Sequence, residues 1–402
     1  MSNEAKYRHP TRSILFITHN RGGGTETHLK DLVVSLENAG VTSFVVRPNP
    51  VNGWQMIVTS GAPNESAVIK ILDFAESPSE LADFMHEYGI GHIHMHHFAG
   101  YIEKAIDYFR LASLIAGLRY DVTIHDFMPY CPRITLIDDS GSYCGEPDMV
   151  QCQSCISRNG SDFGKPVVWE WRDRYLRLFK EARRIFVPSF DTASRISSKF
   201  DGVSVTVRPH QAAAHLEENA ARPAVNVNIA CRPSQSTLRV ATLGSLGPHK
   251  GSGTLVSCAS FASDNKIPIE FVVVGETDRE HDLHKLSNVV MIGKYCDEEL
   301  LSIISKIGPD VLWFPAVWPE TFSYTLSAAF KSGVLPVAFD LGAQSERIRK
   351  LNYGKLVPTV YIDNPEKICE ILLECKTDNN INNHRSFADA RYADILSDYY
   401  SF

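Results

Sequence analysis

The residues best placed to do chemistry lie in the stretch WPETFSYTLSAAF, residues 318–330. Glu320 stands here next to a proline, after the apolar segment DVLWFPA, which has the character of a buried strand. The following TLSAAFKSG predicts a helix that ends at Gly333. Glu320 would then lie at a strand-to-helix turn, where unpaired backbone N–H groups attract anions. An acid at this position either caps the helix or meets a ligand, and the other loops of the chain must decide between these roles.

A glycine-rich loop, RGGG at 21–24, follows the strand-like SILFITH and opens a predicted helix. Gly23 and Gly24 would let the backbone approach a ligand closely, and the helix start would present free N–H groups. The spacing G-x-G-x-x-T lacks the third glycine of the dinucleotide fingerprint, which argues against a nicotinamide cofactor. Alternatively, Thr25 and Glu26 are simple helix caps.

The loop GSLGPHKGSG, residues 244–253, follows the strand-like LRVATL in the same way. Lys250 lies just before a predicted helix, an arrangement suited to holding a phosphate between a point charge and backbone N–H groups. Its spacing does not match a P-loop, which places the lysine directly after the second glycine. A lone loop lysine is more often merely solvated. Lys250 is a candidate for the site because its loop and the Glu320 loop should lie at the same edge of the same sheet.

Histidines gather at the ends of two predicted strands, with His94, His96 and His97 in one and His125 before Asp126 in the other. Their spacing does not match that of metal ligands on a helix. For most of them we expect packing or a local hydrogen bond. His125 is the exception, because it ends the strand DVTI and would face a cleft.

Four cysteines fall within residues 131–155, namely Cys131, Cys144, Cys152 and Cys155. A C-x-x-C pair with two further cysteines nearby is the composition of a small structural zinc site, and free thiols are the alternative. In either case the segment predicts a lid-like insertion beside the histidine.

The composition of the 402-residue chain is that of an ordinary globular protein, with 44% hydrophobic and 22% charged residues. The net charge of −7, without a basic stripe, argues against nucleic-acid binding. A polar N-terminus and the lack of an apolar run near ~18 residues predict a cytoplasmic protein, with peripheral docking on the inner face of a membrane left open. Nine cysteines without a signal peptide predict reduced thiols.

Apolar segments of strand length alternate with amphipathic helical segments along the chain, which predicts an α/β fold with parallel sheets. The first series runs through 1–207 and contains the cysteine-rich insertion 131–155. A connection rich in Pro, Ala and Asn, 208–237, separates it from a second series at 238–382, and a last helical segment covers 383–402. Two α/β halves that face each other would form a cleft for a ligand.

In their order along the chain, these motifs resemble the retaining GT-B glycosyltransferases of the family four type, especially bacterial enzymes of surface-polysaccharide synthesis such as that of O-antigen. The resemblance rests on the glycine loop, HD followed by CPR and the cysteine-bearing insertion, VPS, GSLGPHKG, PETFSYTLS and LGAQSERI. It covers residues 14–360, and PETFSYTLS is its most specific part. It implies two facing Rossmann-like domains, with the acceptor held mainly by the first and the nucleotide-sugar mainly by the second, and a final helix that crosses back to the first domain.

The resemblance also implies roles for individual residues. Glu320 would be the first acid of an E-x7-E motif and would contact the donor sugar, and His125 would lie beside the reacting sugar as the second catalytic residue. Glu346 and the turn LGAQ would support the site from behind. Neither a metal ion nor another cofactor is implied for catalysis. Lys250 and the N–H groups of residues 322–325 would hold the diphosphate. The donor-binding set would be Gly23, Gly24, Gly244, Ser245, Lys250, Glu276, Thr321, Phe322, Ser323, Tyr324 and Thr325.

Two positions depart from the pattern of that family. The second acid of its motif, which holds the ribose hydroxyls, would stand where this chain has Ala328. Its absence makes a dTDP-sugar such as dTDP-rhamnose a candidate donor beside UDP- and GDP-sugars. Ser245 stands where many members have an arginine, so one charge that would neutralise phosphate is missing.

The sequence therefore predicts a metal-independent hexosyl- or deoxyhexosyltransferase that moves a sugar from a nucleotide diphosphate to a saccharide or lipid-linked saccharide acceptor. The alternative is a non-catalytic relative that binds saccharide or a partner transferase, which the two departures favour. A sugar-nucleotide epimerase on the same architecture has no motif here in its favour. Consumption of nucleotide-sugar only in the presence of an acceptor distinguishes transfer from epimerisation.

Overall fold

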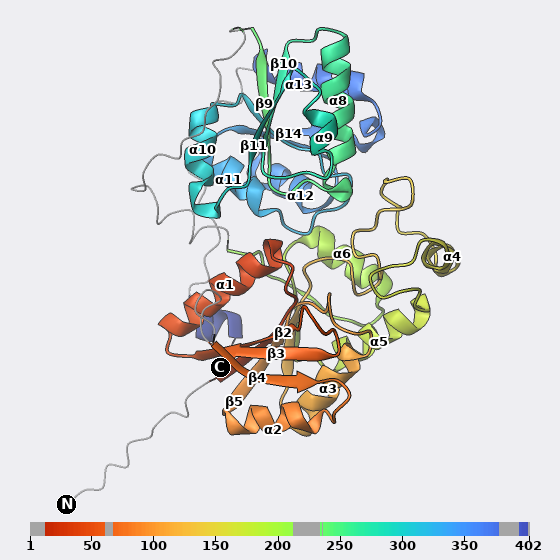
Figure 1. The fold of residues 1–402 in the computed structure, drawn as a ribbon, viewed down its shortest axis with the longest axis vertical. Coiled ribbons are helices and arrows are strands. Elements are labelled where there is room, and N and C mark those ends of the chain that lie inside the picture. The colour runs from red at the N-terminus through yellow and green to blue at the C-terminus, as the bar shows by residue number, and fades with distance from the viewer. Residues whose placement is uncertain (1–12, 61–66, 212–233, 235, 378–393, 401–402) are drawn as a thin grey trace, which may run out of the picture.

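The chain folds around two separate β-sheets, which lie one above the other in Figure 1. The first sheet ends at Val207 and the second begins at Leu238, so the predicted connection lies between them. Much of that connection and most of the predicted last helix lie outside the described residues. The computed structural model describes residues 13–60, 67–211, 234, 236–377 and 394–400.

The N-terminal sheet has eight strands in the order β4-β3-β2-β1-β5-β6-β7-β8. Its strands are β1 Ser13–Ile17, β2 Thr42–Pro48, β3 Gln55–Ser60, β4 Ala67–Asp73, β5 Ile90–Met95, β6 Tyr120–Thr123, β7 Arg184–Val187 and β8 Thr206–Val207. Its helices are α1 Gly23–Asn38, α2 Ser79–Glu87, α3 Ala105–Ile115, α4 Met149–Asn159, α5 Val168–Glu181 and α6 Phe190–Lys199.

The C-terminal sheet has six parallel strands in the order β11-β10-β9-β12-β13-β14. Its strands are β9 Leu238–Leu243, β10 Ile269–Val274, β11 Val289–Gly293, β12 Val311–Phe314, β13 Leu335–Phe339 and β14 Lys355–Val357. Its helices are α8 Ser252–Asp264, α9 Glu280–Leu283, α10 Leu300–Ile307, α11 Tyr324–Ser332, α12 Gly342–Leu351 and α13 Pro365–Thr377. Short helical turns are η1 Pro248–Lys250, η2 Asp297–Glu299 and η3 Thr359–Tyr361.

Burial explains why the central strands were recognisable from their sequence. Every residue of β1, β9, β10, β12 and β13 is buried, as expected for parallel strands covered by helices on both faces. Such strands read as unbroken apolar runs. The prediction of an α/β fold with two parallel-dominated sheets is confirmed.

Two strands at one edge were not expected from the sequence. β3 pairs antiparallel with β2, and β4 pairs antiparallel with β3. Most residues of β4 are exposed or half-buried, so the strand has no continuous apolar run to reveal it. These strands extend the sheet on the side away from β5.

The described end of the chain packs against the N-terminal domain. Its last helical turn, η5 Ile395–Tyr400, lies next to α1, and the carbonyl of Tyr400 accepts hydrogen bonds from Arg183 at 2.7 Å and Arg184 at 2.8 Å. The chain therefore returns to the first domain after building the second. In the parts of the chain covered by the structure, no helix combines the length and apolar character needed to cross a membrane.

Candidate functional site

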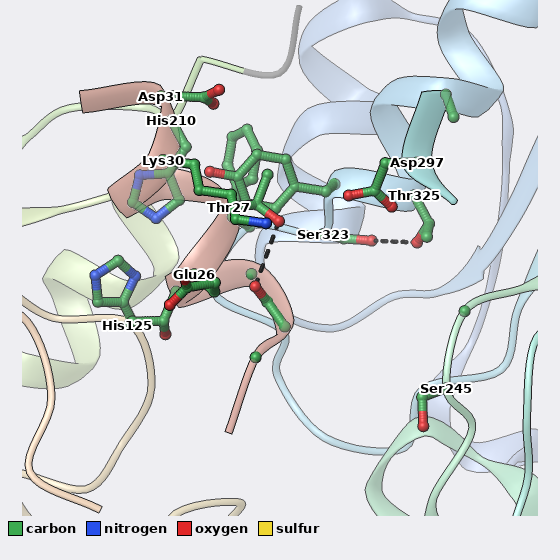
Figure 2. A pocket seen from close by; sticks show the side chains of 18 of the residues that line it. Glu26, Thr27, Lys30, Asp31, His125, His210, Ser245, Asp297, Ser323 and Thr325 are labelled. Atoms are coloured by element: carbon green, nitrogen blue, oxygen red, sulfur yellow. Dashed lines mark hydrogen bonds between the residues drawn. The ribbon is translucent and has the colours of Figure 1, made fainter. Parts of the chain in front are cut away.

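A cavity of about 680 Å³ lies between the two domains, and residues of both form its walls (Figure 2). All but one of the predicted catalytic and donor-binding residues line it: Gly23, Gly24, His125, Gly244, Ser245, Lys250, Glu320, Thr321, Phe322, Ser323, Tyr324 and Thr325. The loops concerned follow β1, β6, β9 and β12, at the carboxyl ends of parallel strands, where α/β sheets bind ligands.

Glu320 lies buried at the turn between β12 and α11, with 9% of its surface exposed. Its Oε1 accepts a hydrogen bond from the Trp318 indole N–H at 3.1 Å and lies 4.0 Å from the Lys250 Nζ. The residue before α11 is Ser323, and no side chain among the described residues caps this helix end. Glu320 is therefore not a helix cap, and its carboxylate is held beside a lysine at the cavity wall.

Lys250 reaches this carboxylate because two neighbouring strands end side by side. β9 and β12 are adjacent in the sheet, so the loops after them emerge at the same edge. Gly251 has a φ of 80°, and a Cβ there would overlap the Pro315 carbonyl, so only glycine lets the two loops pack this closely. The Val317 N–H also donates to the His249 carbonyl at 3.0 Å. Backbone contacts thus fix the distance between the two charges.

The N-terminal end of α11 lines the cavity, and at such a helix end the first backbone N–H groups have no partner within the helix itself. Ser323, just before it, has a φ of 70°, so the chain turns sharply into the helix. Arg347 of α12 holds this turn by donating to the carbonyl oxygens of Phe322 at 3.1 Å and Ser323 at 2.7 Å. It also donates to Ser327 Oγ at 2.6 Å, and Gln344 donates to Ser323 Oγ at 3.1 Å. Gln344 belongs to the turn LGAQ, which the sequence analysis expected to support the site, whereas Arg347 was not singled out.

Glu276 and Glu346 do not line the cavity, and of the two only Glu276 was predicted to contact the donor. Glu276 is not among the residues that line the cavity, and its carboxylate pairs with Lys294 at 3.0 Å. Glu346 lies outside the lining too. Its carboxylate accepts hydrogen bonds from the backbone N–H groups of Phe190 at 3.1 Å and Asp191 at 2.8 Å. These residues begin α6, so Glu346 joins the second domain to a helix N-terminus of the first.

The first domain closes the cavity with the glycine loop before α1. Gly23 has a φ of 74°, a conformation that favours glycine. A Cβ on Gly24 would lie 3.4 Å from the Tyr324 ring, so the loop packs directly against the start of α11. Glu26 pairs with Arg47 at 2.9 Å, and no side-chain cap bond is found at this end of α1 among the described residues. The interpretation of the loop's polar residues as helix caps is therefore wrong.

His125 follows β6 and lines the cavity. Its carbonyl accepts a hydrogen bond from Thr321 Oγ1 at 2.6 Å, which joins the two domains at the site. Its Nε2 lies 2.9 Å from Nδ1 of His96. Burial, followed by the charges of His210 and His96, lowers the pKa of His125 well below its usual value. The imidazole is therefore neutral at pH 7 and acts as a hydrogen-bond partner rather than a cation.

Other histidines of the two strand ends make local contacts, as predicted. His94 is hydrogen-bonded at both ring nitrogens, and the Nε2 of His97 lies 2.6 Å from Asp126 Oδ2. His210, in the connection between the domains, was not singled out from the sequence. It lines the cavity, and its ring centroid lies 3.9 Å from that of His28. No sequence pattern marks it, because its neighbours RP and QAA carry no chemistry of their own.

The four cysteines of the insertion are free thiols near one another. Burial, and then the charges of the other three thiols, raise the pKa of Cys131 to about 12. The sulfur of Cys152 accepts a hydrogen bond from the Arg172 guanidinium at 3.3 Å. Within the described ranges, no group of three or more His, Cys, Asp or Glu side chains is arranged to hold a metal ion. The structural zinc site stays a prediction.

Comparison with known proteins gives a structural answer only. The sequence matches no protein-family model and no curated protein. Among solved structures, sucrose-phosphate synthase from Thermosynechococcus elongatus matches at a TM-score of 0.60 and 15% identity, over 93% of this chain and 92% of that one. Anabaena HepE in complex with UDP and glucose matches at a TM-score of 0.55 and 14% identity, over 93% of this chain and 92% of that one. A glycosyltransferase from Rickettsia africae matches at a TM-score of 0.55 and 14% identity, over 93% of this chain and 95% of that one. The chain has the GT-B fold.

Proposed function

We propose that this protein is a retaining, metal-independent glycosyltransferase of the family four type, which moves a sugar from a nucleoside diphosphate to a saccharide acceptor. The observation that carries the proposal is the buried Glu320 carboxylate beside Lys250, at the turn that leads into the N-terminal end of α11. A negative group for sugar hydroxyls and a positive end for phosphates thus stand next to each other. Anabaena HepE, which shares the fold, was solved with UDP-glucose.

In this proposal the diphosphate binds at the start of α11. Lys250 and residues 323–325 line the cavity, and the lysine and the helix N-terminus would supply positive charge without a metal ion. When the bond between the sugar and the diphosphate oxygen breaks, negative charge grows on that oxygen. Donors that already point there stabilise the transition state more than the ground state.

The sugar would lie between Glu320 and the first domain. Glu320 Oε1 is occupied by the Trp318 indole, and Oε2 has no hydrogen-bond partner in the described part of the chain, so it can accept from a sugar hydroxyl. Neutral His125 faces the same space from the opposite wall. The acceptor hydroxyl would attack the anomeric carbon from the face that the diphosphate leaves, and its proton would pass to the leaving oxygen. The new bond then keeps the configuration of the old one.

The acceptor would bind against the first domain, and we propose a saccharide or lipid-linked saccharide of bacterial polysaccharide synthesis. A lipid-linked acceptor would bring the protein to the inner face of a membrane from the cytoplasm. The donor nucleotide is left among UDP, GDP and dTDP by this argument.

The test is to supply UDP-, GDP- and dTDP-sugars with and without a panel of saccharide acceptors and to measure the nucleoside diphosphate released. Release that depends on the acceptor, with a product whose anomeric configuration equals that of the donor by NMR, is the expected result. Release without acceptor would indicate another reaction, and an inverted product would contradict retention.

Ala328 and Ser245 favour a second candidate, a non-catalytic protein that binds saccharide or a partner transferase. Both residues line the cavity, and neither carries a charge. In that case nucleotide or saccharide would bind without any release of diphosphate from the whole acceptor panel.

A further inference from the structure

Charges of both signs line the cavity wall of the second domain. Lys250 and the start of α11 supply positive charge and N–H donors. Two exposed acids, Asp297 and Glu298 of η2, line the same wall. Neither acid has an ion-pair partner among the described residues. The two carboxylates would repel a phosphate and would attract a neutral group that donates hydrogen bonds, so we expect the phosphates beside Lys250.

If a nucleotide binds with its phosphates at Lys250 and the start of α11, the part beyond the phosphates can reach Asp297, which lines the same cavity. Figure 2 draws Asp297 and Thr325, a residue in the first turn of α11, on the same side of the cavity. Ala328 lies three residues further on the same helix face and also lines the cavity. Because Ala328 has only a methyl group, α11 offers no side-chain acceptor at this point. The Asp297 carboxylate, on the same cavity wall, can supply an acceptor instead.

Tyr295 ties the Asp297 loop to the rest of this wall. Its hydroxyl oxygen lies 3.9 Å from a Cβ built on Gly244, and the Thr325 methyl carbon lies 3.5 Å from the same point. Burial, and then the charge of Asp297, raise the pKa of Tyr295 above its usual value, as expected for a carboxylate close to the phenol. The loop after β9, the start of α11 and η2 therefore form one continuous surface.

We propose that the Asp297 carboxylate accepts hydrogen bonds from the ribose hydroxyls of the nucleotide, so that the cavity selects ribonucleoside diphosphates over their 2′-deoxy forms. An ionised carboxylate has two oxygens and accepts from both hydroxyls of a vicinal diol. A deoxyribose leaves one of these bonds unmade at a site that still has to be desolvated. The inference rests on the proposed function, because it assumes that a nucleoside diphosphate occupies this cavity. It sets aside the dTDP-sugars that Ala328 had suggested.

The experiment is a calorimetric titration of the full chain with matched pairs: UDP and 2′-deoxy-UDP, GDP and 2′-deoxy-GDP, and ribothymidine diphosphate and dTDP. We expect the ribo form of the preferred base to bind roughly tenfold more tightly than its deoxy form. Asp297→Asn should reduce this ratio to near one with little effect on the deoxy form. Glu298→Gln, which removes the same charge from the next residue, should keep the ratio.

The possible failures are distinguishable. If the wild-type chain binds none of these nucleotides, the proposed function itself fails. If it binds a ribo and deoxy pair equally, or if Asp297→Asn keeps the ratio while thermal unfolding shows an intact fold, the donor site stands and the role of Asp297 is refuted. If Glu298→Gln instead abolishes the preference for the ribo form, Glu298 and not Asp297 contacts the ribose, and the proposal is refuted.

Discussion

Glu320 combines features that a structural acid does not need. It is 9% exposed, one of its oxygens is held by an indole N–H, and a lysine lies 4.0 Å away at the wall of a cavity. From its own stretch of sequence a helix cap was the more common role for this acid, and only the other loops favoured ligand contact, because TFSYT does not reveal where the helix begins. The helix starts only at Tyr324, and that position, set by the packing of α12, decides between the two.

Glu320→Gln should leave the fold intact and remove most of the transferase activity. The amide oxygen can still accept from Trp318, so we expect a melting temperature within a few degrees of wild type. The lost charge should lower kcat by about 10²-fold or more. Full activity in a well-folded Gln variant would return Glu320 to a structural role.

Arg347→Met should damage the anion-binding turn. The change leaves the half-buried carbonyls of Phe322 and Ser323 without their donor, so we expect a loss of about 2–4 kcal/mol in the free energy of unfolding and weaker nucleotide binding. Arg349→Met on the same helix is the matched control. Its partner Asp340 is exposed, and the cost should stay below about 1 kcal/mol in urea unfolding. Equal losses in the two variants would contradict the assignment.

At the scale of elements, the strands that end in the site were readable because they are buried apolar runs, whereas their order in the sheet was not. Nothing in the sequence of β9 shows that β12, about seventy residues later, lies beside it. The edge strands β3 and β4 were missed because most of their residues are half-buried or, in β4, exposed, so neither strand is a continuous apolar run. Local pattern thus predicts which elements exist, and contacts between distant elements decide which loops meet.

Gly251→Ala should separate the two loops that carry Lys250 and Glu320. The new Cβ would overlap the Pro315 carbonyl at a φ of 80°, so we expect a loss of at least about 2 kcal/mol in unfolding free energy and weaker binding of nucleoside diphosphates. Gly253→Ala, two residues on, meets nothing within 4 Å and should be neutral or stabilising by about 0.5–1 kcal/mol. Similar unfolding curves for the two variants would show that the close packing is not required.

At the scale of the whole molecule, the site depends on how the two domains meet. Thr321 bonds to the His125 carbonyl, and Glu346 bonds to the start of α6, so contacts on the cavity wall and outside it join the halves. The partners in these bonds are 156 and 196 positions apart in the sequence. No local sequence pattern can predict such pairs. The sequence therefore predicted two domains and a cleft but not the residues that hold the cleft together.

Buried histidines between the sheet and the cleft should make the protein sensitive to acid. Burial lowers the pKa of His28 from 6.5 to about 3, and lowers those of His96, His125 and His210 as well. Below pH 6.5 the unfolded chain binds protons that the folded chain does not. The free energy of unfolding therefore decreases as the pH is lowered, by up to about 1.4 kcal/mol per pH unit for each such histidine. Urea unfolding at pH 7.5 and 5.5 measures this, and His28→Gln should reduce the difference. Equal stability at both values would contradict the burial of neutral imidazoles.

The central claim is that the cavity between the two domains is a nucleoside-diphosphate site, and the most direct test is a thermal-shift titration with UDP, GDP, dTDP and CMP. A ligand at ~100 times its Kd adds about 2.7 kcal/mol of stability. The account predicts that at least one diphosphate raises the melting temperature and that the monophosphate CMP does not, because it lacks the group that Lys250 and α11 are placed to hold. No stabilisation by any of the four would contradict the account.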